Sequence, residues 1–202
     1  MTITYQVRNA IYVNLTNRCP CACTFCLRAN GPGVYGSDSL WLEREPTREE
    51  AIAAVDAANP AQYAELVFCG YGEPTERLDD LLAIARHVRE HYPWVKIRVN
   101  TNGLADLIAG APTVAKCKGL VDIFSISLNT PDPAEYLAIC RPKFGEAAYP
   151  AMLKFAEDAH AAGIDVVMTV VDEPVTSKAK QAECRAICDR LGVRLRVRPF
   201  EA

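Results

Sequence analysis

The 202-residue sequence has no long apolar run, and no stretch reaches the roughly 18 residues that a membrane-spanning helix needs. Residues 1–17 do not show the basic segment followed by an apolar one that marks a secretory signal. Low-complexity tracts, internal repeats and linker-like stretches are also missing. We therefore expect a single domain over residues 1–202 that lies in the cytoplasm and has no membrane partner.

The sequence also has no excess of positive charge. It contains 22 Lys and Arg against 25 Asp and Glu, which gives a formal net charge of −3. Sequence-independent binding to nucleic acid depends on a basic surface that neutralises phosphates. The composition therefore indicates no nucleic-acid partner and is typical of an ordinary globular domain.

Cysteine, in contrast, is abundant, with nine residues of which four fall within positions 19–26. Cysteines this close together in a reducing compartment bind metal more often than they form disulfides. Cys19, Cys23 and Cys26 are spaced C-x-x-x-C-x-x-C, so three thiolates on one loop can hold three irons of a cubane cluster and leave the fourth iron open. A zinc site is the alternative, although no second ligand pair with zinc spacing is evident.

Short β-prone runs alternate with segments of helical periodicity along the chain. Thr47 and Glu50 form a capping box that predicts a helix over 47–58. Further helices are expected at about 79–91, 104–116, 133–139, 147–162 and 177–191. Six strands are expected at 12–15, 66–68, 96–100, 121–128, 164–171 and 193–197. Helical crossovers between strands predict a parallel sheet, either open and doubly wound or an incomplete barrel.

Glycine-rich and polar motifs follow the expected strands, where ligands bind in parallel β/α folds. The cysteine loop follows the first strand, the turn Gly70–Glu73 the second, and the segment Asn100–Gly103 the third. Ser127 and Asn129 lie on and just after the fourth. Glycine at two positions of the first turn lets the backbone approach a ligand closely. This convergence predicts one site at the carboxyl ends of the strands.

The cysteine motif, with Phe25 directly before its last cysteine, resembles the signature of the radical S-adenosylmethionine (radical SAM) enzymes. The core of that family is a partial (β/α)6 barrel, and a glycine-rich turn after its second strand binds the methionine moiety of SAM. Gly70-Tyr-Gly-Glu73 matches that turn. The resemblance implies an α/β fold, a partial (β/α)6 TIM-like barrel, with residues 1–202 forming one radical SAM core domain.

By that resemblance, Cys19, Cys23 and Cys26 ligate a 4Fe–4S cluster whose open iron binds SAM. Reductive cleavage of SAM would give a 5′-deoxyadenosyl radical that abstracts hydrogen from a substrate, with an electron donor such as flavodoxin or ferredoxin. No residue is assigned a catalytic role. The resemblance implies cofactor contacts from Phe25, Gly70, Tyr71, Gly72, Glu73, Asn102, Ser127 and Asn129.

Three features either depart from the family pattern or allow two interpretations. Cys21 is an extra thiol that allows the alternative triplet Cys21, Cys23 and Cys26, but we expect it to be a spectator because Cys19 gives the commonest spacing. The fifth strand lacks the glycine of the family's adenine-site pattern. Arg196 and Arg198 share one face of the last strand, where they either line the interior and bind an anionic group or lie at a solvated edge.

Residues 14–20 (NLTNRCP), 36–43 (GSDSLWLE) and 70–75 (GYGEPT) most resemble the TatD-associated radical SAM proteins. That resemblance implies a functional link to a TatD-type hydrolase and leaves the substrate, a small molecule or a protein, undefined. Two other enzymes remain as alternatives: a glycyl-radical-enzyme activase and an enzyme similar to 7-carboxy-7-deazaguanine synthase. The non-enzyme alternative is a zinc- or cluster-binding module.

Overall fold

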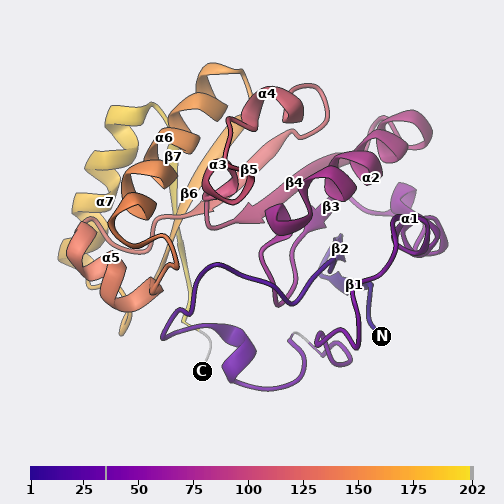
Figure 1. The fold of residues 1–202 in the computed structure, drawn as a ribbon, viewed down its shortest axis with the longest axis horizontal. Coiled ribbons are helices and arrows are strands. Elements are labelled where there is room, and N and C mark those ends of the chain that lie inside the picture. Colours follow the sequence, from indigo (N-terminus) through magenta and orange to yellow (C-terminus); the bar gives the residue numbers. More distant parts are fainter. Residues whose placement is uncertain (35, 201–202) are drawn as a thin grey trace.

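The computed structural model describes residues 1–34 and 36–200, so part of the domain expected over 1–202 lies outside the described residues. The chain forms one seven-stranded sheet whose strands follow each other in chain order (Figure 1). β1 and β2 are antiparallel, and every other neighbouring pair is parallel. The strands are β1 (Thr4–Val7), β2 (Ala10–Val13), β3 (Glu65–Phe68), β4 (Lys96–Thr101), β5 (Ile123–Ser127), β6 (Asp165–Val171) and β7 (Arg194–Arg198).

This strand order decides between the two architectures expected from the sequence. A doubly wound sheet reverses its order at a switch point, whereas the order over the described residues runs from β1 to β7 without reversal. The sheet is therefore open and matches an incomplete barrel. The six expected strands correspond to β2–β7, and the expected number of strands was wrong by one. β1 was not predicted because the turn between β1 and β2 contains no glycine to mark it. Arg8 takes the positive φ of 52° in that turn.

The helices lie where the periodicity predicts them, with one exception. Thr47 and Glu50 form the predicted capping box. The expected helix over 104–116 is instead two short helices, because Gly110 ends the first in the left-handed conformation (φ 67°) and Pro112 follows. The helices are α1 (Arg48–Ala57), α2 (Leu78–His91), α3 (Ala105–Ala109), α4 (Val114–Cys117), α5 (Pro133–Cys140), α6 (Ala148–Ala161) and α7 (Lys178–Leu191).

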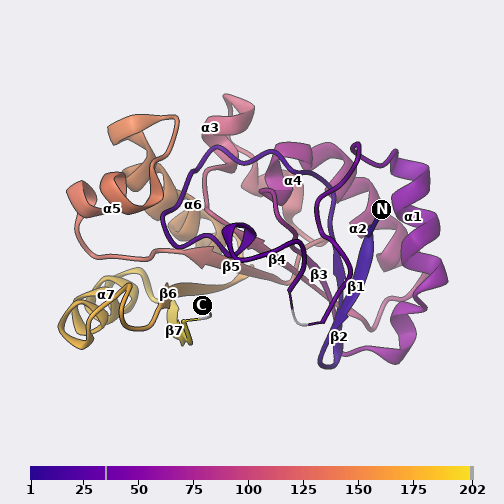
Figure 2. The same cartoon turned by 90° about the horizontal axis from the view of Figure 1, so that it is seen from below.

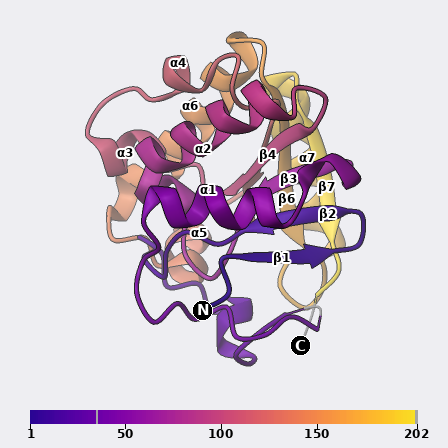
Figure 3. The ribbon, with the colours of Figure 1, turned by 90° about the vertical axis from the view of Figure 1, so that its right-hand side faces the viewer.

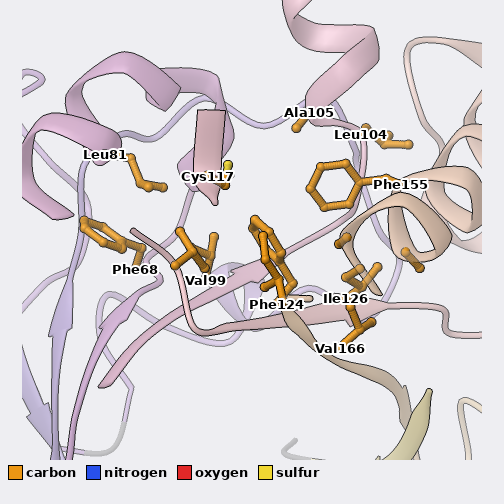
Figure 4. Close-up of a cluster of buried hydrophobic side chains, with 14 of the residues drawn as sticks. Phe68, Leu81, Val99, Leu104, Ala105, Cys117, Phe124, Ile126, Phe155 and Val166 are labelled. Carbon is orange, nitrogen blue, oxygen red and sulfur yellow. The ribbon is translucent and has the colours of Figure 1, made fainter. Parts of the chain in front are cut away.

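Figure 3 shows helices packed along one face of the sheet. The hydrophobic core fills the space between these helices and the sheet (Figure 4). Phe68, Val99 and Phe124 from three neighbouring strands are fully buried there. The ring of Phe124 meets Phe155 of α6 edge-on, with centroids 5.0 Å apart. Burying apolar area on this face stabilises the fold and leaves the opposite face of the sheet free for polar residues.

The segment that follows β2 covers the carboxyl ends of the strands. It runs along the lower edge of the molecule in Figure 1, and the view from below shows it passing in front of β3, β4 and β5 (Figure 2). It carries the cysteine motif and the short 3-10 helix η1 (Leu27–Ala29). Over the described residues, no helix combines the length and apolar character needed to cross a membrane.

Candidate active site

A cavity of about 250 Å³ lies between the cysteine loop and the polar face of the sheet. All of the residues for which the sequence predicts a role in cluster or cofactor binding line it. They are Cys19, Cys23, Phe25, Cys26, Gly70, Tyr71, Gly72, Glu73, Asn102, Ser127 and Asn129. Segments far apart in the sequence thus meet at one place, as the strand-end positions of the motifs indicate.

Backbone pairing with the end of α5 positions the cysteine loop. The amide of Thr24 donates to the carbonyl of Ile139 at 2.9 Å, and the amide of Lys143 donates to the carbonyl of Pro20 at 2.8 Å. A β-bridge between the loop and the segment 139–143 lies between these two bonds. The loop is therefore held along its length by main-chain contacts, which leaves its thiols free to face the cavity.

The thiols differ in their surroundings. Cys19, Cys23 and Cys26 are half-buried, whereas Cys21 is only 5% exposed. Hydrogen bonds with Cys140, the larger effect, and with Cys21 lower the pKa of Cys23. A hydrogen bond with Cys21 likewise lowers the pKa of Cys19. Burial raises the pKa of Cys26. The pKa of Cys21 is raised because its hydrogen bonds to Cys19 and Cys23, together with burial, favour the protonated form.

The cysteine side chains that line the cavity are suited to binding an iron–sulfur cluster. Among the residues that the structure describes, no three Cys, His, Asp or Glu side chains converge on a single ion position. Cys19, Cys23 and Cys26 all line the cavity, and a cubane cluster offers a separate iron to each thiolate. Asn129 lines the same cavity, and its Oδ1 is fully buried and has no hydrogen-bond partner in the described part of the chain. A bound cofactor can satisfy that acceptor.

The glycine turn after β3 packs tightly against the start of the cysteine loop. A Cβ at Gly72 would lie 2.3 Å from the carbonyl oxygen of Thr16 and 2.6 Å from that of Arg18. A Cβ at Gly70 would lie 2.0 Å from Oδ1 of Asn14. Glycine is thus required here for a close approach to the protein's own chain, and the predicted approach to a ligand remains a prediction.

Glu73 joins the glycine turn to the end of β4. Its carboxylate is 4% exposed and accepts hydrogen bonds from the hydroxyl of Thr101 and the amide of Asn102, both at 2.7 Å. It also accepts from the hydroxyl and the amide of Thr75, at 2.8 and 3.1 Å. Burial raises the pKa of Glu73, while these hydrogen bonds lower it. The carboxylate therefore positions two cavity-lining segments relative to each other.

Side-chain contacts fix the other predicted cofactor residues in place. The hydroxyl of Tyr71 donates to the carbonyl of Gly31 at 2.6 Å, and its ring meets that of Trp41 edge-on. Nδ2 of Asn129 donates to Sγ of Cys140 at 3.4 Å. Asn129 adopts the left-handed conformation, with φ 65°, which asparagine tolerates better than most residues.

Sequence reasoning missed some residues of the cavity. Thr169 on β6 lines it and pairs in register with Ser127 of β5. The alternation of the strand places Val167, Thr169 and Val171 on one face of β6 and could have identified Thr169. The prediction for this strand instead relied on a glycine of the family pattern, which the strand lacks. Thr101, which binds Glu73, was missed because nothing in the sequence shows that the two meet.

Comparison with known proteins places these features in a family. A model of the Radical SAM superfamily matches residues 13–181. The GTP 3′,8-cyclase of Mycobacterium ulcerans (strain Agy99) is 30% identical over 188 residues, which cover 92% of this chain and 48% of the cyclase. The probable dual-specificity RNA methyltransferase RlmN of Rhodococcus erythropolis (strain PR4 / NBRC 100887) is 29% identical over 139 residues, covering 63% of this chain and 36% of RlmN.

Solved structures show the same fold. The structure of Streptococcus suis SuiB bound to S-adenosylmethionine matches with a TM-score of 0.69 and 15% identity, covering 95% of this chain and 40% of SuiB. At that identity the likeness concerns the fold alone. The chain spans about half the length of the curated relatives it matches.

Proposed function

Because the chain belongs to the radical SAM superfamily, whose enzymes use a 4Fe–4S cluster and SAM, we propose that the cavity beneath the cysteine loop is where this chain carries out that chemistry. Cys19, Cys23 and Cys26 hold the cluster. When bound, the cluster and SAM supply a 5′-deoxyadenosyl radical that abstracts hydrogen from a substrate. The meeting of these three thiols with the turn after β3 and the polar ends of β4 and β5 in one cavity carries the proposal.

The residues opposite the cysteine loop form the seat for SAM. Asn129 offers Oδ1, a buried acceptor suited to an amino or hydroxyl donor of the cofactor. Ser127 and Asn102 line the same cavity and supply further polar groups. Glu73 holds the turn with Gly70 and the end of β4 at a fixed separation, so that both can contact one ligand.

The aromatic residues of the site exclude water. Phe25 lies half-buried on the cysteine loop, and Tyr71 is 6% exposed beneath Trp41. Both line the cavity close to the thiols. An apolar wall at this position limits the access of water and oxygen to a reactive group, which is a general requirement of radical chemistry.

The finer assignment is to the TatD-associated radical SAM proteins, with a functional link to a TatD-type hydrolase, and it is supported by the motifs at 14–20, 36–43 and 70–75. The substrate is a small molecule or a protein. A reduced flavodoxin or ferredoxin supplies the electron. The proposed compartment is the cytoplasm, where thiols stay reduced and clusters persist.

The proposed function is tested on protein purified and reconstituted with iron and sulfide under anaerobic conditions. After reduction with dithionite and addition of SAM, we expect a brown protein that forms 5′-deoxyadenosine and methionine. Cys23→Ala should form neither product, whereas Cys188→Ala, which removes a buried thiol of α7, should form both. A colourless protein with stoichiometric zinc and no 5′-deoxyadenosine would identify a zinc-binding module instead.

A second experiment on the same sample identifies the substrate. Deuterated candidate metabolites and peptides are added with SAM, and the 5′-deoxyadenosine is analysed by mass spectrometry. Transfer of deuterium into 5′-deoxyadenosine identifies the molecule that loses hydrogen. Transfer from a peptide glycine would favour the glycyl-radical-enzyme activase over an enzyme that acts on a small molecule.

A further inference from the structure

Three arginines on the polar face of the sheet line the cavity or the hollow beside it. Arg98 lies on β4, and Arg196 and Arg198 lie two residues apart on β7, so their side chains share one face. Arg196 pairs in register with Thr169, which lines the cavity. Arg196 and Arg198 line it as well, and all three arginines line a second hollow of about 800 Å³ that borders it. This face of the sheet thus presents three positive charges to the second hollow.

The neighbouring arginines differ in how their charges are neutralised. Arg98 forms an ion pair with Glu65 at 2.9 Å, and Arg194, at the start of β7, pairs with Asp165 at 2.5 Å. Arg196 donates to the hydroxyl of Ser125 at 3.1 Å. Within residues 1–34 and 36–200, neither Arg196 nor Arg198 has an ion pair with a carboxylate.

Two further observations concern the surroundings of these guanidinium groups. Nε of Arg198 is buried and has no hydrogen-bond partner among the described residues. Arg196 is exposed on β7, and partial desolvation of its guanidinium, followed by the positive charges of Arg98 and Arg198, lowers its pKa. Buried donors are normally paired, and adjacent positive charges repel each other. A bound anion relieves both penalties.

The position of the arginines separates them from the glycine turn, which is proposed to bind the methionine end of SAM. The glycine turn follows β3, and three strands lie between β3 and β7 in the sheet. At about 4.8 Å per strand step, the two walls are about 19 Å apart along the curved sheet. The methionine end of SAM and the arginines therefore occupy different parts of one continuous interior.

We infer that Arg196 and Arg198 form an anion-binding subsite for the substrate, and that the substrate carries a phosphate or carboxylate group. Guanidinium groups bind both anions through charge-assisted, often bidentate hydrogen bonds. The subsite holds the anionic group at β7 and directs the remainder of the substrate toward the cysteine loop. This inference rests on the proposed function for the identity of the reaction, but not for the binding of the anion.

The test measures anion binding to the reconstituted protein by isothermal titration calorimetry, with pyrophosphate and malonate as separate probes. We expect at least one of them to bind. The more tightly bound probe identifies the anionic group. Arg196→Gln and Arg198→Gln should each weaken its binding about tenfold or more, because each loses a charged hydrogen bond. Arg196→Lys, which keeps the charge, should bind more tightly than Arg196→Gln.

Arg194→Gln is the matched control, since it removes the same charge from the same strand at an exposed ion pair and should leave anion binding unchanged. SAM binding is measured in every variant. Absence of binding by both probes, or equal binding by all variants, would overturn the inference. If Arg196→Gln lost SAM binding to the same extent as anion binding, the arginines would belong to the cofactor site, and this result would also overturn the inference. Protein that binds the probe but fails to cleave SAM would contradict the proposed function alone.

Discussion

The carboxylate of Glu73 accepts a 2.7 Å hydrogen bond from the backbone amide of Asn102. This bond joins the turn after β3 to the end of β4, and the two segments form adjacent parts of the cavity wall. Because the carboxylate is buried and accepts three further hydrogen bonds, its position is fixed by the protein. The distance between the two segments therefore depends on one side chain.

Glu73→Gln should destabilise the protein by about 1–3 kcal/mol, because an amide nitrogen replaces one acceptor oxygen and faces donors. Urea unfolding of the anaerobic protein measures the change. SAM affinity should fall as well, since the two wall segments lose their common partner. Glu43→Gln, at an exposed position, is the control and should change neither quantity. Equal stability of the two variants would show that Glu73 does not position these segments.

The raised pKa of Glu73 predicts a specific pH dependence. Over the window between its ordinary value of 4.5 and the raised value, the folded state binds a proton that the unfolded state has lost. The free energy of unfolding contributed by Glu73 therefore falls as the pH rises through this window. Glu73→Gln cannot ionise and should lack this component. A constant difference in stability between the wild type and the variant from acid to neutral pH would contradict the raised pKa.

Cys21→Ala should retain the cluster, whereas Cys19→Ala should lose it. Cys21 is buried, and Nδ2 of Asn102 lies 3.8 Å from its sulfur. Iron and sulfide content and the absorbance of the reconstituted variants measure cluster loading. The opposite outcome, with a loaded Cys19→Ala and an empty Cys21→Ala, would replace the predicted ligand triplet by Cys21, Cys23 and Cys26.

Gly72→Ala should lower both stability and cluster content. Its Cβ would lie 2.3 Å from a backbone oxygen of Thr16, so the start of the cysteine loop must shift. Gly110→Ala separates these two effects. The Cβ added at position 110 would meet no atom within 4 Å, but an alanine at φ 67° costs about 1 kcal/mol of stability. The Gly110 variant should be less stable with full cluster content. Normal cluster content in Gly72→Ala would show that the loop tolerates the displacement.

Asn129→Gly should weaken SAM binding about tenfold, which corresponds to one lost hydrogen bond. Glycine retains the left-handed backbone at φ 65° and removes only the side chain. Asn59→Gly is a matched control, since Asn59 has a similar φ of 50°, is exposed and does not line the cavity. Equilibrium dialysis with labelled SAM measures both variants. Unchanged affinity in Asn129→Gly would remove Asn129 from the cofactor seat.

Much of the site was predictable because it depends on local signals. The spacing of Cys19, Cys23 and Cys26 is visible in eight residues, and strand-to-turn boundaries place Gly70 and Ser127 at the carboxyl ends of parallel strands. In a parallel sheet those ends meet at one edge whatever the details of packing. The structure confirms that convergence, while the individual roles of these residues remain predictions.

The remaining features depend on contacts that no local pattern encodes. The close approach of Gly72 to Thr16 joins residues that are far apart in the sequence. The role of Glu73 as a bridge depends on where β3 and β4 place Thr101. The alternation of Arg196 and Arg198 predicted a shared face, but only the three-dimensional structure shows that this face lines the cavity.

The electron paramagnetic resonance spectrum of the dithionite-reduced, reconstituted protein, recorded before and after addition of SAM, tests the open-iron site most directly. We predict a reduced 4Fe–4S signal whose g values shift when SAM is added, because SAM binds the iron that Cys19, Cys23 and Cys26 leave open. The signal should be absent in Cys23→Ala. A cluster signal that SAM leaves unchanged, or a wild-type protein without a cluster signal, would contradict the proposed site.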